Sequence, residues 1–232
     1  KSDANEVWAA LGQKSGVAER ALDLVAELSV MVARRPTGDM KAFPVALNQH
    51  ERHVLTWSAM PAPIAPDLAK RATEIGFGVA EQLRIEGLLA VELFLTRTGD
   101  LYVNELAPRP HNSFHASERA CETGQFEQLV RAICDLPLGD TDVVRPAAIV
   151  NLFGDLWRNE GGPPIADALS GGHTRLHLYG KGDPRPGRKM GHLSAVGGTA
   201  LDALAIARDA ARRLGIETAA PPEALREFGA GV

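Results

Sequence analysis

The sequence predicts an α+β fold in which helices pack on an antiparallel sheet. Two apolar runs separated by a Gly-containing turn fill residues 87–107, and this pattern is typical of a β-hairpin. Residues 66–85 open with a proline and keep apolar residues at helical spacing, which predicts a helix. With 232 residues, 45% of them hydrophobic, the chain can bury a substantial core as one large domain or two smaller ones.

Capping, alternation and helical spacing predict the other elements of the first part of the chain. Asp3, followed three residues later by Glu6, is typical of a helix start. Apolar stretches broken by prolines and other turn formers are typical of strands with irregular ends. In chain order we expect a helix over 3–11, strands over 17–24 and 26–35, sheet segments between 42 and 64, and a helix over 116–136 that is interrupted near Gly124.

Residues 136–147, LPLGDTDVVRPA, are rich in turn formers and indicate a domain boundary. We therefore expect a first domain over residues 1–138, which holds the antiparallel sheet, and a small, mostly β second domain over residues 139–232. The expected elements of the second domain are strands over 147–153, 174–180 and 191–197, followed by a terminal helix over 200–215.

The composition argues against several classes of function. A formal net charge of -4 and a pI near 6.0 give no reason to expect nucleic acid or an anionic membrane as a partner, because phosphate-binding surfaces need clustered Lys and Arg. No apolar run approaches the roughly twenty residues that a membrane span needs. Cys121 and Cys134 have no His or Cys at ligand spacing, so neither a zinc site nor a disulfide framework is expected. A cytoplasmic location fits these features best.

Two glutamates are predicted to face each other in the hairpin. A two-residue turn at Thr98 and Gly99 would set Glu92 directly opposite Glu105, with their Cβ atoms about 5 Å apart. Like charges in otherwise apolar strands are unfavourable without a cation, and Mg²⁺ takes one or two carboxylates together with water and phosphate oxygens. Asn104 could add a side-chain carbonyl. The alternative is that both acids lie on a solvated face and neutralise nearby arginines.

The stretch ELAPRPHNSFH, residues 105–115, gathers polar groups where the second strand ends. Arg109 offers a planar fork of donors that suits carboxylate or phosphate oxygens, and the imidazole of His111 can hold or transfer a proton. Pro108 and Pro110 restrict the loop, so these groups lose little entropy when they bind. The alternative is that the histidine is an ordinary solvent-exposed loop residue.

A second basic cluster lies at residues 179–192, YGKGDPRPGRKMGH, among glycines and prolines. Its cations, Lys181, Arg185, Arg188 and Lys189, indicate an anion site in a chain that is acidic overall. The alternatives are a solvated turn and a nucleic-acid patch, and the lack of interleaved aromatic residues argues against the second of these.

Taken together and in this order, the motifs resemble the ATP-grasp ligases, and within them the 5-(carboxyamino)imidazole ribonucleotide synthase family of purine biosynthesis. The resemblance rests on GLLAVELFLTRTGDLYVNELAPRPHNS, QFEQLVRAICDLPLG and HLYGKGDPRPGRKMGH, and covers residues 17–197. It implies an enzyme that uses ATP and Mg²⁺ to activate bicarbonate as carboxyphosphate. The carboxyl group then passes to the exocyclic amine of aminoimidazole ribonucleotide, with release of ADP and phosphate. It also implies a homodimer.

The resemblance assigns the metal and nucleotide sites by position in the motifs. The metal-binding carboxylates of the family fall on Glu92 and Glu105. Contacts with ATP fall on two acids eight positions apart, Glu19 and Glu27. They also fall on two backbone positions at the adenine edge, Ala21 and Leu22, and on Asn104, the residue before the second metal ligand. For the two acids and the two backbone positions, ordinary strand packing is the alternative.

The resemblance also assigns the site of bicarbonate activation. We expect Arg109 and His111 of the RPHNS motif and Lys181 of the YGK motif to be catalytic. Substrate contacts fall on the remaining polar positions of the same two motifs: Asn112, Ser113, Arg188 and Lys189.

The chain departs from the family pattern in two places. Phe114 stands where the family usually has glycine, and we expect it to narrow the mouth of the pocket or to reflect lineage variation. No Gly-rich phosphate loop or lid is found in the first fifteen residues, so we expect a C-terminal part of the enzyme that binds nucleotide weakly on its own. Another ATP-grasp ligase and a non-catalytic nucleotide-binding or dimerisation module stay open as alternatives.

Overall fold

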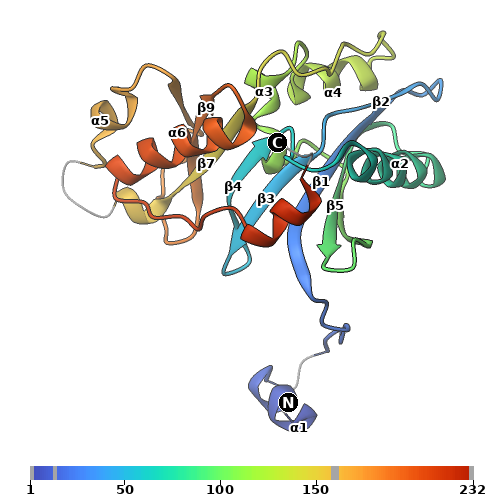
Figure 1. The fold of residues 1–232 in the computed structure, drawn as a ribbon, viewed down its shortest axis with the longest axis horizontal. Coiled ribbons are helices and arrows are strands. Elements are labelled where there is room, and N and C mark those ends of the chain that lie inside the picture. The colour runs from blue at the N-terminus through green and yellow to red at the C-terminus, as the bar shows by residue number, and fades with distance from the viewer. Residues whose placement is uncertain (1–2, 13–14, 158–161, 230–232) are drawn as a thin grey trace.

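The computed structural model describes residues 3–12, 15–157 and 162–229. Within these ranges, nine antiparallel strands form one sheet in the order β6-β5-β1-β3-β4-β7-β9-β8, with β2 beside β1 (Figure 1). The strands are β1 (Leu24–Arg34), β2 (Met40–Ala42), β3 (Ala46–Glu51), β4 (Val54–Met60), β5 (Gly87–Thr96), β6 (Leu101–Ala107), β7 (Ala147–Phe153), β8 (Thr174–Leu178) and β9 (Lys189–Val196).

The helices of the same ranges are α1 (Ala4–Ala10), α2 (Pro66–Gln82), α3 (Ser117–Ala120), α4 (Gln125–Ile133), α5 (Ile165–Leu169) and α6 (Ala200–Arg213), with short 3-10 helices η1 (Asn112–Phe114), η2 (Gly154–Trp157) and η3 (Glu223–Phe228). None of them is long and apolar enough to cross a membrane. The mixture of an antiparallel sheet with packed helices confirms the predicted α+β class.

Helices cover both faces of the sheet, and the central strand β1 is therefore buried on both sides. Val30 and Val32 of β1 pack with residues of α2 in one apolar cluster, which α6 completes. Met31 and Ala33, which point the other way, pack with residues of η1, α3 and α4 in a second cluster. Because successive strand residues alternate between faces, two covered faces require the nearly continuous apolar run that β1 shows.

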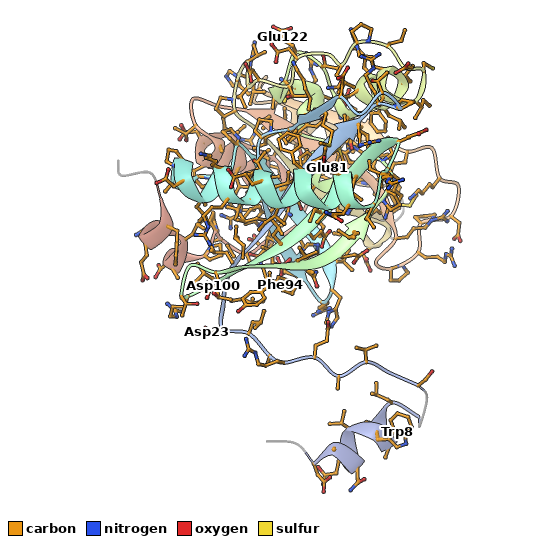
Figure 2. The ribbon with its side chains drawn as sticks, turned by 90° about the vertical axis from the view of Figure 1, so that its right-hand side faces the viewer. Trp8, Asp23, Glu81, Phe94, Asp100 and Glu122 are labelled. Carbon is orange, nitrogen blue, oxygen red and sulfur yellow. The ribbon has the colours of Figure 1, made fainter. Side chains whose placement is uncertain are left out.

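The N-terminal segment differs from the prediction. The helix α1 is confirmed, and the Asp3 side chain accepts a hydrogen bond from Asn5 N, but α1 has no buried residue. The strand expected over 17–24 is wrong: residues 17–23 are coil, exposed except for the half-buried Leu22, and β1 starts at Leu24. Figures 1 and 2 show this coil leaving the sheet toward α1, with Trp8 far from the sheet. Among the described residues, no strand pairs with residues 17–23. Their backbone groups therefore have no ladder of hydrogen bonds to join, and a strand does not form there.

The hairpin β5-β6 confirms the predicted pairing of Glu92 with Glu105, although its turn differs from the prediction. Thr96 N donates to Asp100 O, which leaves three turn residues in place of two, and Gly99 takes a left-handed φ of 81°. A bulge between Glu92 and Leu93 then adds one residue on β6, at Asn104, and restores the register. The two offsets cancel, so the two glutamates stand opposite each other.

The remaining elements follow the predicted order. The helix expected over 116–136 is indeed interrupted, because α3 ends at Ala120 and Gly124 caps the start of α4. The strands β7, β8 and β9 and the helix α6 lie where they were expected. β7 pairs with β4, so the sheet continues across residue 138, and the boundary between two domains there stays a prediction.

Candidate functional site

A pocket of about 380 Å³ opens on the face of the sheet that carries η1. We call it the carboxylate pocket, because three glutamates line it together with three histidines, two asparagines and a lysine. These side chains come from four neighbouring strands, from the turn between β3 and β4, from the loop after β6 and from the start of β9: Glu27, His50, His53, Glu92, Asn104, Glu105, His111, Asn112 and Lys189.

Glu92 is held in this pocket by His111. Its Oε1 lies 3.2 Å from Nε2 of His111, and both side chains are largely buried. The hydrogen bond from His111 lowers the pKa of Glu92 below its ordinary value; burial opposes this effect, while the charges of His111 and His50 and a hydrogen bond from Asn104 add to it. Glu92 is therefore held as a carboxylate. Glu105, directly across the hairpin, lines the same pocket from the edge strand.

The donor set fits a hard divalent cation. Glu92 and Glu105 supply carboxylate oxygens on one face, and Asn104 lies at the bulge beside them. In the described residues, no cluster of three or more His, Cys, Asp or Glu side chains is arranged to hold a metal ion. Mg²⁺ commonly binds one or two protein carboxylates and completes its shell with water and phosphate oxygens, so two carboxylates on an open pocket suit it.

The hydrogen bonds around His111 fix its tautomer. The backbone N–H of Ser113 donates to Nδ1 of His111, at 3.4 Å, so that Nε2 carries the proton and faces Glu92. The backbone N–H of His111 donates in turn to Oε1 of Gln125, at 2.8 Å. Two contacts thus hold the imidazole at the pocket wall, and a third holds the backbone of the same residue.

Cations approach the pocket from two loops. Lys189 lines it, and burial lowers the pKa of Lys189; the charge of Glu92 opposes this shift, while Arg109 and Lys181 add to it. Nζ of Lys181 donates to Lys189 O at 2.7 Å and lies 5.3 Å from the centre of the Tyr179 ring. The structure therefore brings the cations of both predicted motifs near one another.

Other predicted residues lie away from the pocket. Nη1 of Arg188 donates to Asp183 O at 2.8 Å, within its own loop. Ser113 is fully buried, 3.5 Å from the Oγ of Ser29, and its carbonyl accepts from Ser58, so it supports the loop from beneath. Asn112 does line the pocket, and its Oδ1 is buried without a partner among the described atoms.

The predicted nucleotide residues are divided. Glu27 and Asn104 line the carboxylate pocket, whereas Ala21 and Leu22 line a separate hollow of about 400 Å³ beside the β5-β6 turn. Glu19 is exposed on the N-terminal coil and lines neither. Their roles stay predictions.

Phe114 does not narrow the pocket. Its ring is fully buried and packs on Phe43, with ring centres 6.0 Å apart, so it belongs to the apolar core beneath η1. The residue that stands in place of the usual glycine therefore fills core volume, which corrects the expectation of a narrowed mouth.

His50 and Gln125 belong to the site or its support, although no sequence motif indicated them. His50 forms an ion pair with Glu27 across β1 and β3. Its position follows only from the pairing of those strands and from a bulge next to it in the pairing of β3 with β4. Gln125 starts α4, and no local pattern indicates that it reaches the His111 loop.

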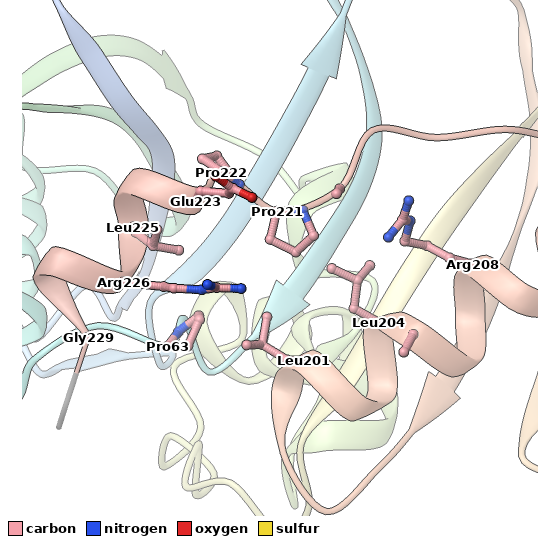
Figure 3. A pocket seen from close by; sticks show the side chains of 12 residues that line it. Pro63, Leu201, Leu204, Arg208, Pro221, Pro222, Glu223, Leu225, Arg226 and Gly229 are labelled. Carbon is pink, nitrogen blue, oxygen red and sulfur yellow. The ribbon is translucent and has the colours of Figure 1, made fainter. Parts of the chain in front are cut away.

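A larger groove, of about 690 Å³, lies on the opposite face of the sheet between α6 and η3 (Figure 3). Leu204 and Pro221 give it an apolar wall, and Arg208 and Arg226 stand at its sides. It lacks paired carboxylates, so the carboxylate pocket is the better candidate for chemistry.

Comparison with known proteins places the chain in a class. The ATP-grasp domain family matches residues 1–126, more than half of the chain, and the chain belongs to the ATP-grasp family. The family described as the phosphoribosylaminoimidazole carboxylase C-terminal domain matches residues 147–205.

Within that class, the chain is similar to N5-carboxyaminoimidazole ribonucleotide synthases, the enzyme family that its motifs resemble. The enzyme of Bacillus subtilis is 44% identical over 169 residues, which cover 72% of this chain and 43% of that protein. The synthetase structure from Thermotoga maritima has a TM-score of 0.77 at 38% identity and covers 87% of this chain and 56% of that one. The Aspergillus clavatus synthase, solved with ADP and 5-aminoimidazole ribonucleotide, has a TM-score of 0.73 at 26% identity, covering 84% and 53%. The chain spans about half the length of these relatives.

Proposed function

We propose that this chain is the part of a 5-(carboxyamino)imidazole ribonucleotide synthase that holds the phosphates of ATP and activates bicarbonate. The proposed reaction consumes ATP and bicarbonate, forms carboxyphosphate and carboxylates the exocyclic amine of 5-aminoimidazole ribonucleotide, with release of ADP and phosphate. One observation carries the proposal: Glu92 and Glu105 stand opposite each other in one pocket with His111 bound to Glu92. The similarity to synthases that bear this name supports it.

In this proposal the two glutamates and Asn104 hold magnesium, which offsets the negative charge of the phosphates when it is bound. Lys189 lines the pocket and is assigned to the anionic oxygens of bicarbonate and phosphate, and Lys181 and Arg109, whose charges act on Lys189, are assigned to the same oxygens. Burial lowers the pKa of Lys189, and an anion in the pocket would favour its charged form.

His111 is the proposed catalytic histidine of the loop. Its Nε2–H, which donates to Glu92, can donate instead to an oxygen of bicarbonate or carboxyphosphate bound in the same pocket. We also propose a homodimer and a cytoplasmic location, as expected for a soluble enzyme of purine biosynthesis.

The test uses the intact protein that contains this chain and measures ADP release with bicarbonate and 5-aminoimidazole ribonucleotide. We expect Glu92→Gln and His111→Asn each to lower the rate at least about a hundredfold, the typical loss of an acid–base or charge-stabilising group. Glu74→Gln on the exposed face of α2 is the matched control.

Two outcomes would reject the proposal. Equal ADP release with other amines would favour a different ATP-grasp ligase, and full activity of His111→Asn would favour a site in which this loop only binds.

A further inference from the structure

A buried network of neutral groups lies directly behind the His111 loop. Its centre is Gln125, the first residue of α4, which is fully buried. Oε1 of Gln125 accepts the backbone N–H of His111 at 2.8 Å, and Nε2 of the same amide lies 3.2 Å from Nδ1 of His115. Because a backbone N–H can only donate, the amide orientation is fixed, and Gln125 donates to His115.

The network continues through stacked rings. The ring of His192 lies between those of His115 and His177, with centre distances of 4.6 and 4.5 Å and interplanar angles of 11° and 14°. Nδ1 of His192 is 2.8 Å from the hydroxyl of Tyr179, the residue whose ring lies below Lys181. The stack therefore joins the loop of His111 to the strand end that carries Lys181.

The charges of these groups agree with the geometry. Burial lowers the pKa of His115 to about 4 and that of His192 to about 3, and it raises the pKa of Tyr179 to about 12. Near neutral pH, the two imidazoles are uncharged and each accepts a hydrogen bond at Nδ1, from Gln125 and from Tyr179 respectively. The hydrogen bonds of Gln125 with His111 and His115, and of Tyr179 with His192, each join a donor to an acceptor, and such a buried network resists rearrangement.

We infer that Gln125 is a positioning residue, which holds the backbone of His111 against the stacked histidines so that the imidazole faces Glu92. This inference rests on the proposed function for its catalytic meaning, but not for its geometry. Gln125 does not reach the carboxylate pocket itself, so it acts through His111.

The same helix offers a matched control. Gln128 is also fully buried on α4, and its amide also makes two hydrogen bonds, to the O and N of Gly139 at 3.0 and 2.8 Å. A change at Gln128 should therefore cost similar stability and leave His111 untouched. Gln125→Glu is the conservative variant, because either protonation state keeps an oxygen acceptor for the His111 N–H.

The first readout is hydrogen exchange of the His111 amide in the intact protein at neutral pH. We expect the amide to be protected in the wild type, in Gln125→Glu and in Gln128→Ala. In Gln125→Ala we expect exchange at least about tenfold faster, because losing about 1.4 kcal/mol of hydrogen-bond free energy raises the exchange rate about tenfold. Unchanged protection in Gln125→Ala would overturn the inference.

The second readout is the bicarbonate-dependent release of ADP. We expect Gln125→Ala to lower kcat about tenfold or more with the KM for ATP within about twofold, Gln125→Glu to restore most of the rate, and Gln128→Ala to keep it. Equal kcat values for the two alanine variants would overturn the positioning role. If the wild type releases no ADP, the proposed function fails, and the exchange experiment alone still decides whether Gln125 holds His111.

Discussion

Acid should destabilise this protein through two histidines that are buried without charge. Burial lowers the pKa of His115 to about 4 and that of His192 to about 3 from an ordinary value of 6.5. Between the folded and unfolded pKa values, these two histidines are therefore protonated in the unfolded chain and neutral in the folded chain. Since the folded pKa lies below the unfolded one, the folded state is favoured fully above pH 6.5, and this advantage is lost as the pH falls toward the folded values.

The size of the effect follows from the width of the window. Below pH 6.5, each histidine lowers the free energy of unfolding by about 1.4 kcal/mol per pH unit. Between pH 7 and 5 the loss is about 2 kcal/mol for each histidine and about 4 kcal/mol for the two. Burial also lowers the pKa of His177, which acts in the same direction. The carboxylate of Glu92, whose pKa is lowered from 4.5, loses its contribution only below this window. A fall of about 4 kcal/mol is a large part of the 5–15 kcal/mol typical of folded proteins.

Urea unfolding at half-unit steps between pH 5 and 8 measures this loss. Replacing His115 or His192 by glutamine should each reduce the loss of unfolding free energy between pH 7 and 5 by about 2 kcal/mol, since glutamine does not titrate. His173, exposed before β8, gives the control His173→Gln, which should leave the slope unchanged. A wild-type loss below about 1 kcal/mol, or equal slopes in all variants, would refute the argument that the stacked imidazoles are neutral.

Two further predictions concern the helix α2 and the cysteines. Gly76→Ala should destabilise the protein by about 1–3 kcal/mol, because the added Cβ would lie 2.8 Å from Cγ1 of Val30. Gly78→Ala should stabilise the protein by about 0.5–1 kcal/mol, because no atom lies within 4 Å of the added Cβ. Thermal unfolding measures both changes, and equal shifts of the melting temperature would contradict the packing of α2 on β1. Burial raises the pKa of the Cys121 thiol to about 12, so at pH 8 a disulfide reagent should modify the exposed Cys134 much faster than Cys121, and equal rates would argue against this burial.

Features that depend on neighbouring residues were predictable from the sequence, and features that depend on distant segments were not. The helix over 66–85 and the pairing of Glu92 with Glu105 were predictable, because helical spacing and a short hairpin involve neighbouring residues only. Even there, the turn length was wrong by one residue, and a bulge at Asn104 compensated. The strand expected over 17–24 failed because apolar alternation says nothing about whether a partner strand is present.

The sequence by itself determined the α+β class, the family resemblance and the carboxylate pair, since these depend on local periodicity and on short motifs. Only the tertiary structure decided that Lys189 enters the carboxylate pocket, that His50 meets Glu27, and that Gln125 reaches the His111 loop. The physical reason is distance along the chain: these contacts join segments that are far apart in sequence, and only the order and register of the strands bring them together.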